Sequence, residues 1–139
     1  MSLLARADEN TLAALWERWP AKLEFDWLRR PEFGLVMVRG RTGGTGAPFN
    51  LGEMTVTRCA LRLADGTVGH AYVQGRSARK AEIAALADAL GQNPSARKRL
   101  EETILAPLAD AAALKRNVAA AETAATRVEF YTMVRGENA

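Results

Sequence analysis

Hydrophobic residues near the start of the chain recur with the period of an α-helix. The positions i, i+3, i+4 and i+7 hold Leu12, Leu15, Trp16 and Trp19. Asn10 or Thr11 can cap this helix, and Pro20 interrupts it. A second short helix is predicted over residues 23–30, before Pro31. Residues 1–30 are therefore predicted to form a helical N-terminal segment.

The two-residue alternation of β-strands follows in three segments. They cover residues 33–41, 54–63 and 68–74. Asp65-Gly66, between the second and third segments, is a strong signal for a two-residue hairpin turn. The stretch from Thr42 to Asn50 reads as the loop that joins the first two strands. Residues 33–76 are thus predicted to form an antiparallel β-meander.

A helical period returns at Ser77, which is a plausible N-cap, and Gly91 is a plausible C-cap. A second helix is expected from about Ser95 to just before Pro107. An alanine-rich helix follows, with one stripe formed by Ala111, Leu114, Val118 and Ala121. Residues 77–126 are therefore predicted to be helical, and residues 127–134 to form a last strand.

This order of elements predicts one α+β domain over residues 1–139. We expect an antiparallel sheet of about four strands, with N-terminal helices and a C-terminal helical pair packed on it. The chain is 48% hydrophobic, which is enough for a sizeable core. It shows no apolar run of membrane-spanning length, and its polar start does not resemble a secretory signal. We therefore expect a cytoplasmic protein.

Composition excludes several classes of function. A single cysteine, Cys59, rules out an internal disulfide, and one cysteine with one histidine cannot form a Cys/His zinc site. The net charge of +3 is too small, and the basic residues are too scattered, to indicate nucleic-acid binding. His70 and Cys59 both lie within predicted strands, so we interpret them as a half-buried structural histidine and a small core residue.

The glycine-rich loop Arg41-Thr42-Gly43-Gly44-Thr45-Gly46 is the strongest candidate for chemistry. Glycines leave backbone N–H groups uncovered, and arginine matches phosphate oxygens. The spacing is neither that of a Walker A loop nor that of a dinucleotide fingerprint. Three interpretations stay open: the glycines only satisfy turn geometry, the loop contacts another protein, or its amides contact a phosphate-like anion.

Arginines near this loop form a second candidate group. Arg39 and Arg41 share a face of the first predicted strand, Arg58 lies on the second, and Arg76 lies where the third strand meets a helix. If the register brings these faces together, the sheet carries a cluster suited to polyphosphate. The alternative is that the arginines form ion pairs with carboxylates such as Glu53 and Glu82.

Aromatic residues at both ends of the chain are candidates for a partner interface. They are Trp16, Trp19, Trp27, Phe130 and Tyr131, together with Arg135. The tryptophans could equally cover the domain's own sheet. An unpartnered interface is expected to be an exposed apolar patch, and such a patch is compatible with a homo-oligomer of the isolated chain.

Three segments together resemble the PhnG family, the G subunit of the carbon–phosphorus lyase system of bacterial phosphonate catabolism. The first is the RTGGTG loop with Leu51-Gly52-Glu53 and Thr57-Arg58 after it, and the second is Tyr72-Val73-Gln74-Gly75-Arg76. The third is the closing FYTMVRGEN, residues 130–138. The resemblance covers most of residues 33–138.

The resemblance implies an accessory subunit, with no self-contained active site, of a complex with PhnI, PhnH and PhnJ. With PhnI, PhnH and PhnL, the family acts in a step in which an alkylphosphonate displaces adenine from ATP. ATP is then a substrate of the assembled complex, and no cofactor is expected on this chain alone. Where the family often has an acidic residue and a histidine, this chain has Ser77 and Lys80. The second departure argues against acid–base chemistry at that position.

Overall fold

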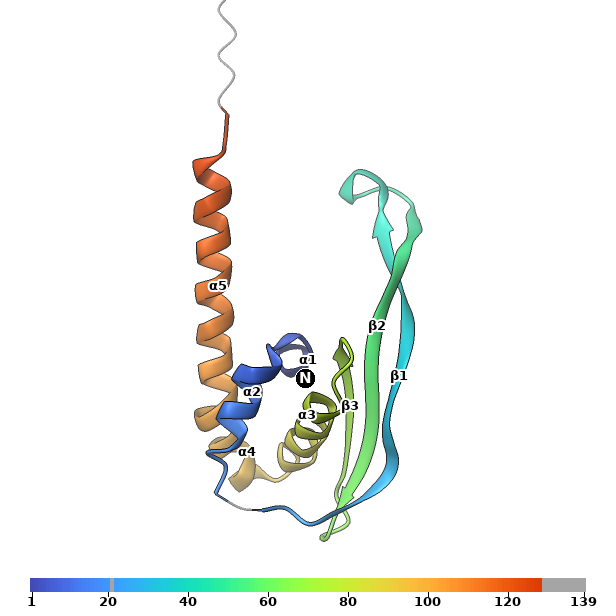
Figure 1. Ribbon diagram of the computed structural model, residues 1–139, viewed down its shortest axis with the longest axis vertical. Helices are drawn as coiled ribbons and strands as arrows, with labels where there is room; N and C mark the ends of the chain where they lie inside the picture. Colours follow the sequence, from blue (N-terminus) through green and yellow to red (C-terminus); the bar gives the residue numbers. More distant parts are fainter. Residues whose placement is uncertain (21, 129–139) are drawn as a thin grey trace, which may run out of the picture.

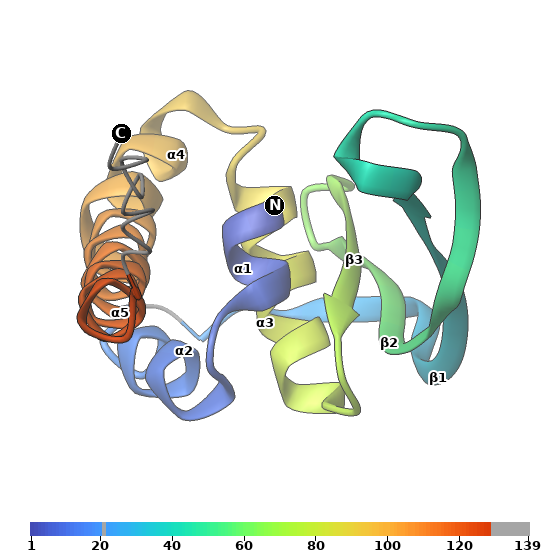
Figure 2. The ribbon, with the colours of Figure 1, turned by 90° about the horizontal axis from the view of Figure 1, so that it is seen from above.

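The computed structural model describes residues 1–20 and 22–128. Its helices are α1 (Ser2–Arg6), α2 (Glu9–Trp16), α3 (Ala78–Leu90), α4 (Pro94–Leu100) and α5 (Ala106–Ala125). Its strands are β1 (Phe25–Arg41), β2 (Pro48–Leu63) and β3 (Val68–Gln74). Helices α3 and α1 pack on one face of the sheet, and α2 and α5 lie beyond them on the same side (Figures 1 and 2). The predicted α+β class is confirmed.

The described strands form one antiparallel sheet in the order β1-β2-β3. β1 and β2 pair along almost their full lengths, from Phe25 opposite Leu63 to Arg41 opposite Pro48. β3 is shorter and pairs only with residues 56–62 of β2. Residues 35–55 therefore extend past β3 as a two-stranded projection, which we call the hairpin arm (Figure 1).

The second N-terminal helix, predicted over residues 23–30, is wrong because β1 already begins at Phe25. Leu23, Phe25 and Trp27 are half-buried, and the residues between them are exposed, which is the period of a strand. Pro31 is tolerated because β1 is an edge strand with a register shift between Arg29 and Glu32. Residues 1–20 keep the predicted helical character, as α1 and α2.

The meander is confirmed, with small differences at its turns. Gly66 has φ of 88°, and the Leu63 N–H donates to the Thr67 carbonyl, so the β2–β3 connection is longer than the two residues predicted. The arm's turn is shorter than the predicted loop, because β2 already begins at Pro48. A 3₁₀ turn over Thr42–Gly44 makes the connection.

Helix α3 holds the sheet through small residues. Its buried face carries Ala81, Ala84, Ala85, Ala87 and Ala89, and alanine allows a close approach. The predicted cap at Ser77 is confirmed, since its hydroxyl accepts a hydrogen bond from the Lys80 N–H at 3.0 Å. The core lies between this helix, the sheet and the N-terminal helices.

Side chains of α3 also satisfy the outer edge of β3. The Asp88 carboxylate accepts the His70 N–H at 2.9 Å, and the Gln92 amide donates to the Val68 carbonyl at 2.8 Å. These contacts cover an edge that could otherwise pair with another strand. The His70 side chain is exposed rather than half-buried as expected, because none of the described helices covers the outer face of β3.

The last helices run together rather than ending before Pro107. A π-helical turn over Glu101–Leu105 joins α4 to α5. Pro107 lies in the first turn of α5, where a proline needs no N–H bond, so it does not break the chain's helical course. The predicted strand over residues 127–134 lies mostly outside the described residues, and the described sheet has three strands rather than about four.

We predict that Gly69→Ala destabilises the protein by about 3 kcal/mol. A Cβ at Gly69 would run into the Ala85 carbonyl of α3 and would lie 3.0 Å from the Ala89 Cβ. Gly34→Ala is the matched control in β1, because a Cβ there meets no heavy atom within 4 Å. Urea unfolding followed by circular dichroism measures both changes. Equal losses in the two variants would contradict the close-packing explanation.

Candidate functional site

The candidate arginines do not meet at one place. Arg39 lies opposite Asn50 near the tip of the hairpin arm, whereas Arg58 lies opposite Tyr72 in the body of the sheet. Residues 50 and 58 are eight positions apart on β2, which corresponds to roughly 25 Å. By strand alternation, Arg58 also projects from the opposite face to Arg39 and Arg41. The register therefore does not bring Arg39, Arg41 and Arg58 into one cluster.

Arg58 is held by neighbours from its own chain. Its guanidinium lies 3.1 Å from Glu32 and donates to the Tyr72 hydroxyl at 3.2 Å. Arg29 lies 2.9 Å from the other oxygen of Glu32. The hydrogen bond from Arg58 lowers the pKa of Glu32 below its usual range, and the contact with Tyr72 followed by that with Glu32 raises the pKa of Arg58. Arg58 thus forms an ion pair, which was the alternative to binding polyphosphate, and its partner is Glu32 rather than Glu53 or Glu82.

A small cavity lies beside this network on the outer face of the sheet. Its volume is about 200 Å³, and Val36, Val56, Arg58 and Tyr72 are among the residues that line it. Its walls combine apolar side chains with a guanidinium that already has a carboxylate partner. This arrangement suits a small, largely uncharged group better than a phosphate.

The glycine-rich loop is shaped by its own turn. Gly43 and Gly44 have positive φ values of 59° and 84°, which glycine adopts without strain. The Gly46 N–H donates to the Thr42 carbonyl at 2.8 Å, and Arg41 donates to the Gly46 carbonyl at 3.2 Å. Turn geometry therefore explains all three glycines, since a Cβ at Gly46 would also clash with the Thr42 carbonyl. Thr42 and Thr45 are exposed at the tip of the arm.

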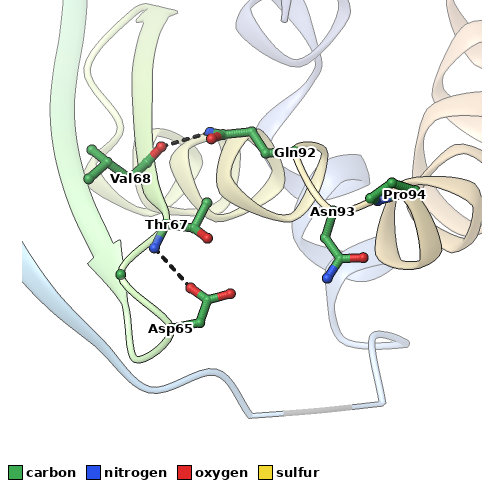
Figure 3. A pocket seen from close by; sticks show the side chains of 7 residues that line it. Asp65, Thr67, Val68, Gln92, Asn93 and Pro94 are labelled. Atoms are coloured by element: carbon green, nitrogen blue, oxygen red, sulfur yellow. Dashed lines mark hydrogen bonds between the residues drawn. The ribbon is translucent and has the colours of Figure 1, made fainter.

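A second cavity lies between the β2–β3 turn and the start of α4 (Figure 3). It measures about 550 Å³ and is lined by Asp65, Gly66, Thr67, Val68, Gln92, Asn93 and Pro94. Asp65 accepts the Thr67 N–H at 2.9 Å, which lowers the pKa of its carboxyl. Asn93 caps α4 by accepting the Ser95 N–H at 3.0 Å. Of these residues, sequence analysis singled out only Asp65-Gly66, which it interpreted as a turn. The structure shows Asp65 and Gly66 in the turn between β2 and β3.

The junction between β3 and α3 is a buried network of polar groups. The Thr57 hydroxyl donates to the Gly75 carbonyl at 2.7 Å and accepts the Ser77 N–H at 3.1 Å. Lys80 is buried in the first turn of α3, and its ammonium donates to the Gln74 carbonyl at 3.3 Å. Burial lowers the pKa of Lys80. Arg76 follows β3 at this junction, with an exposed side chain.

The three tryptophans and Cys59 lie in or near the core. Trp16 is buried and stacks on Trp19, with ring centroids 5.7 Å apart, and the Arg99 guanidinium lies 5.8 Å from the Trp19 ring. Trp27 packs edge-on against Phe25. The tryptophans therefore pack within their own domain. Cys59 is buried as expected, and burial raises the pKa of its thiol to about 11. Phe130, Tyr131 and Arg135 lie outside the described residues.

Most of the exposed large apolar residues lie elsewhere, in or beside the hairpin arm and on α5. Phe33, Leu35 and Met37 are exposed in β1, and Leu114 and Val118 are exposed on α5. Sequence analysis predicted a strand over residues 33–41 and placed Leu114 and Val118 on one helical stripe, but it assigned neither face to the core or to solvent. The one available signal was that the β1 row ends in two arginines, Arg39 and Arg41, which a buried strand face rarely carries.

The described residues include no group of three or more His, Cys, Asp or Glu side chains arranged to hold a metal ion. Over the same part of the chain, none of the helices combines the length and the apolar character needed to cross a membrane.

The structure thus defines an α+β domain with a projecting hairpin and a projecting helix, and the comparisons identify its family. The family model described as "Phosphonate metabolism protein PhnG" matches residues 1–136, and the chain belongs to this family. A relative from Rhizobium meliloti (strain 1021) is 48% identical over 141 residues, covering 99% of this chain and 88% of that protein. It is named alpha-D-ribose 1-methylphosphonate 5-triphosphate synthase subunit PhnG.

We predict that Lys80→Met stabilises the protein at neutral pH and that its advantage shrinks as the pH rises. Because burial lowers the pKa of Lys80 in the folded state, the folded protein releases this proton before the unfolded chain does. The wild type therefore gains stability as the pH rises through the folded pKa towards 10.5, the usual lysine value. Lys80→Met cannot show this gain.

Urea unfolding at pH 7, 8.5 and 10 measures the difference between the two proteins. Lys98→Met, at an exposed position on α4, is the matched control for removing a lysine. A stability difference for Lys80→Met that stays constant over this range would refute the prediction.

Proposed function

We propose that this chain is a subunit of a synthase that joins an alkylphosphonate to the ribose of ATP. The observation that carries the proposal is the 48% identity, over 99% of the chain, to a subunit of alpha-D-ribose 1-methylphosphonate 5-triphosphate synthase. In this reaction a phosphonate oxygen forms a bond to C1 of the ribose. The bond from C1 to adenine breaks, and adenine leaves with a proton.

We propose an accessory role for the chain, with ATP and phosphonate bound in the assembled complex. The titratable groups that sequence and structure single out are occupied by structural contacts. Glu32 is held by two arginines, Lys80 donates within the β3–α3 junction, and Cys59 is a core thiol. The exposed apolar rows on the hairpin arm and α5 suit a chain that works by contacting other chains.

By the family resemblance, we propose PhnI, PhnH and PhnL as its partners in this step and PhnJ as a further subunit. The substrates are polyanions, so any direct contribution from this chain would come from arginines that are free to reach them. Arg39 and Arg41 are the best placed, because both are exposed on one face at the tip of the arm.

The test is reconstitution of the complex from purified subunits, with and without this chain. Adenine release from ATP and methylphosphonate is followed by chromatography. We expect release to require this chain, and equal rates without it would overturn the proposed function. The product is checked by ³¹P NMR, since the phosphonate signal must shift on ester formation.

A second comparison separates the accessory role from a direct one. The double variant Arg39→Ala, Arg41→Ala is assayed beside Arg97→Ala, which removes an exposed arginine on α4. If the chain is accessory, any loss of activity in the double variant follows loss of assembly, as measured by light scattering. A fall of tenfold or more, equivalent to about 1.4 kcal/mol, in an intact complex would assign the arginines to the substrate site instead.

A further inference from the structure

The junction between α4 and α5 is a single π-helical turn, Glu101–Leu105. At its end the Ala106 N–H donates to the carbonyl of Glu101, five residues back, whereas an α-helix uses a spacing of four. A single turn of this kind between α-helical segments is rare, and it is frequently found at functional positions. The sequence around the turn contains two physical reasons for it.

Pro107 is the first reason. A proline has no N–H, so the Thr103 carbonyl cannot accept the usual helical bond from the residue four positions later. In a continuous α-helix the proline ring would also press against that carbonyl. The wider π turn relieves this conflict, and the helical course continues into α5.

The spacing of buried residues is the second reason. Leu100, Ile104 and Leu108 lie four positions apart, and all three are buried. In a regular α-helix each step of four residues overshoots a full turn by about 40°, so Leu108 would face about 80° away from Leu100. A π turn needs more residues to complete one turn, which offsets this drift and keeps the three side chains on the core side.

The helix before the π turn is fixed to the core. Leu100 and Ile104 are 3% and 0% exposed. The Arg99 guanidinium lies 5.8 Å from the centre of the Trp19 ring. These contacts anchor α4 and the π turn to the body of the domain.

Helix α5, beyond the turn, is held much less. Within α5, all of which the structure describes, Leu108 is the one buried residue. Ala112 and Ala113 are half-buried, and the other residues from 109 to 125 are exposed. Its many alanines favour a helix even without packing. Helix α5 therefore has the properties of a rigid rod that is attached at one end (Figure 1).

Three features that bend helices meet at this junction. Two are the proline and the π turn. The third is the Thr103 hydroxyl, which donates to the Arg99 carbonyl at 2.8 Å, four residues back. The regular ladder of backbone hydrogen bonds is therefore interrupted between an anchored α4 and a largely unanchored α5.

We propose that the π turn is a hinge on which α5 swings as one rigid rod while the core keeps its structure. Residues 108–125 extend about 26 Å. A change of about 20° at the hinge, the size of a marked helix kink, moves the free end of α5 by about 9 Å. Because α5 and the hairpin arm project from the same end of the core, this swing changes the space between them (Figures 1 and 2).

The hinge is a property of the free chain and goes beyond the proposed function. It requires neither substrate nor another subunit, so it is tested without the synthase reaction. A failure of either proposal leaves the other standing.

The experiment measures distances between two spin labels by pulsed electron paramagnetic resonance, on the full chain carrying Cys59→Ala. One label is attached at Glu122→Cys near the end of α5, and the other at Arg62→Cys, an exposed position in the body of the sheet. The reference pair joins Arg62→Cys to Lys98→Cys on the anchored α4. We expect the distances across the hinge to spread over about 9 Å more than those of the reference pair.

A third pair of labels lies wholly within α5, at Asp110→Cys and Glu122→Cys. Its distances should be as narrowly distributed as those of the reference pair, because a rod that pivots at its base stays helical. This pair separates a swing of α5 from its unfolding.

Pro107→Ala tests the cause of the hinge. Alanine restores an N–H that can bond to the Thr103 carbonyl, so the distances across the hinge should narrow towards those of the reference pair. Pro94→Ala is the matched control, because Pro94 lies in the first turn of α4, outside the hinge. It should leave the distances unchanged, and circular dichroism with thermal unfolding checks that both variants fold.

The proposal fails if the distances across the hinge are as narrowly distributed as those of the reference pair. It also fails if the pair within α5 gives a broad distribution, since α5 then unfolds instead of swinging. Equal spreads in the wild type and in Pro107→Ala would place the motion outside the π turn and would likewise overturn the hinge.

Discussion

The close approach of α3 to β3 is the contact on which the rest of the structure depends. Gly69 leaves no side chain between the strand and the Ala85 carbonyl, and the alanines of α3 let the helix lie flat on the sheet. At this distance Asp88 and Gln92 reach the edge of β3 and satisfy its backbone groups. A bulkier residue at Gly69 would separate the helix from the sheet and expose that edge.

Because α3 and β3 are short, they leave part of the β1–β2 pair uncovered. β3 ends at Gln74 and α3 covers only the part of the sheet beside it, whereas β1 and β2 continue to Arg41 and Pro48. The uncovered length becomes the hairpin arm, with apolar side chains facing solvent. This chain therefore has a self-sufficient core and incomplete projections, and it belongs to the PhnG family, in which the Rhizobium meliloti relative is named as a synthase subunit.

The charged side chains differ in the same way between the covered core and the uncovered hairpin arm. Within the body of the sheet Arg58 is neutralised by Glu32, and Lys80 lies in a network that fixes the strand-to-helix junction. The arginines at the tip of the arm, Arg39 and Arg41, lie where another molecule can reach them. Arg39 and Arg41 are therefore better placed than Arg58 or Lys80 to contact another molecule.

By itself the sequence determined the α+β class, the meander, the Ser77 cap and the family, because these depend on local periodicity, turn residues and contiguous motifs. Tertiary structure alone decided that residues 25–30 are a strand, since an edge strand tolerates Pro31. It also decided that Arg58 and Arg39 stand apart and that the rows of Leu35 and Leu114 face solvent. The pairing register of two strands depends on which elements meet, and the burial of an apolar row depends on how far its neighbours extend. Hydrophobic periodicity along the sequence gives no information on these two properties.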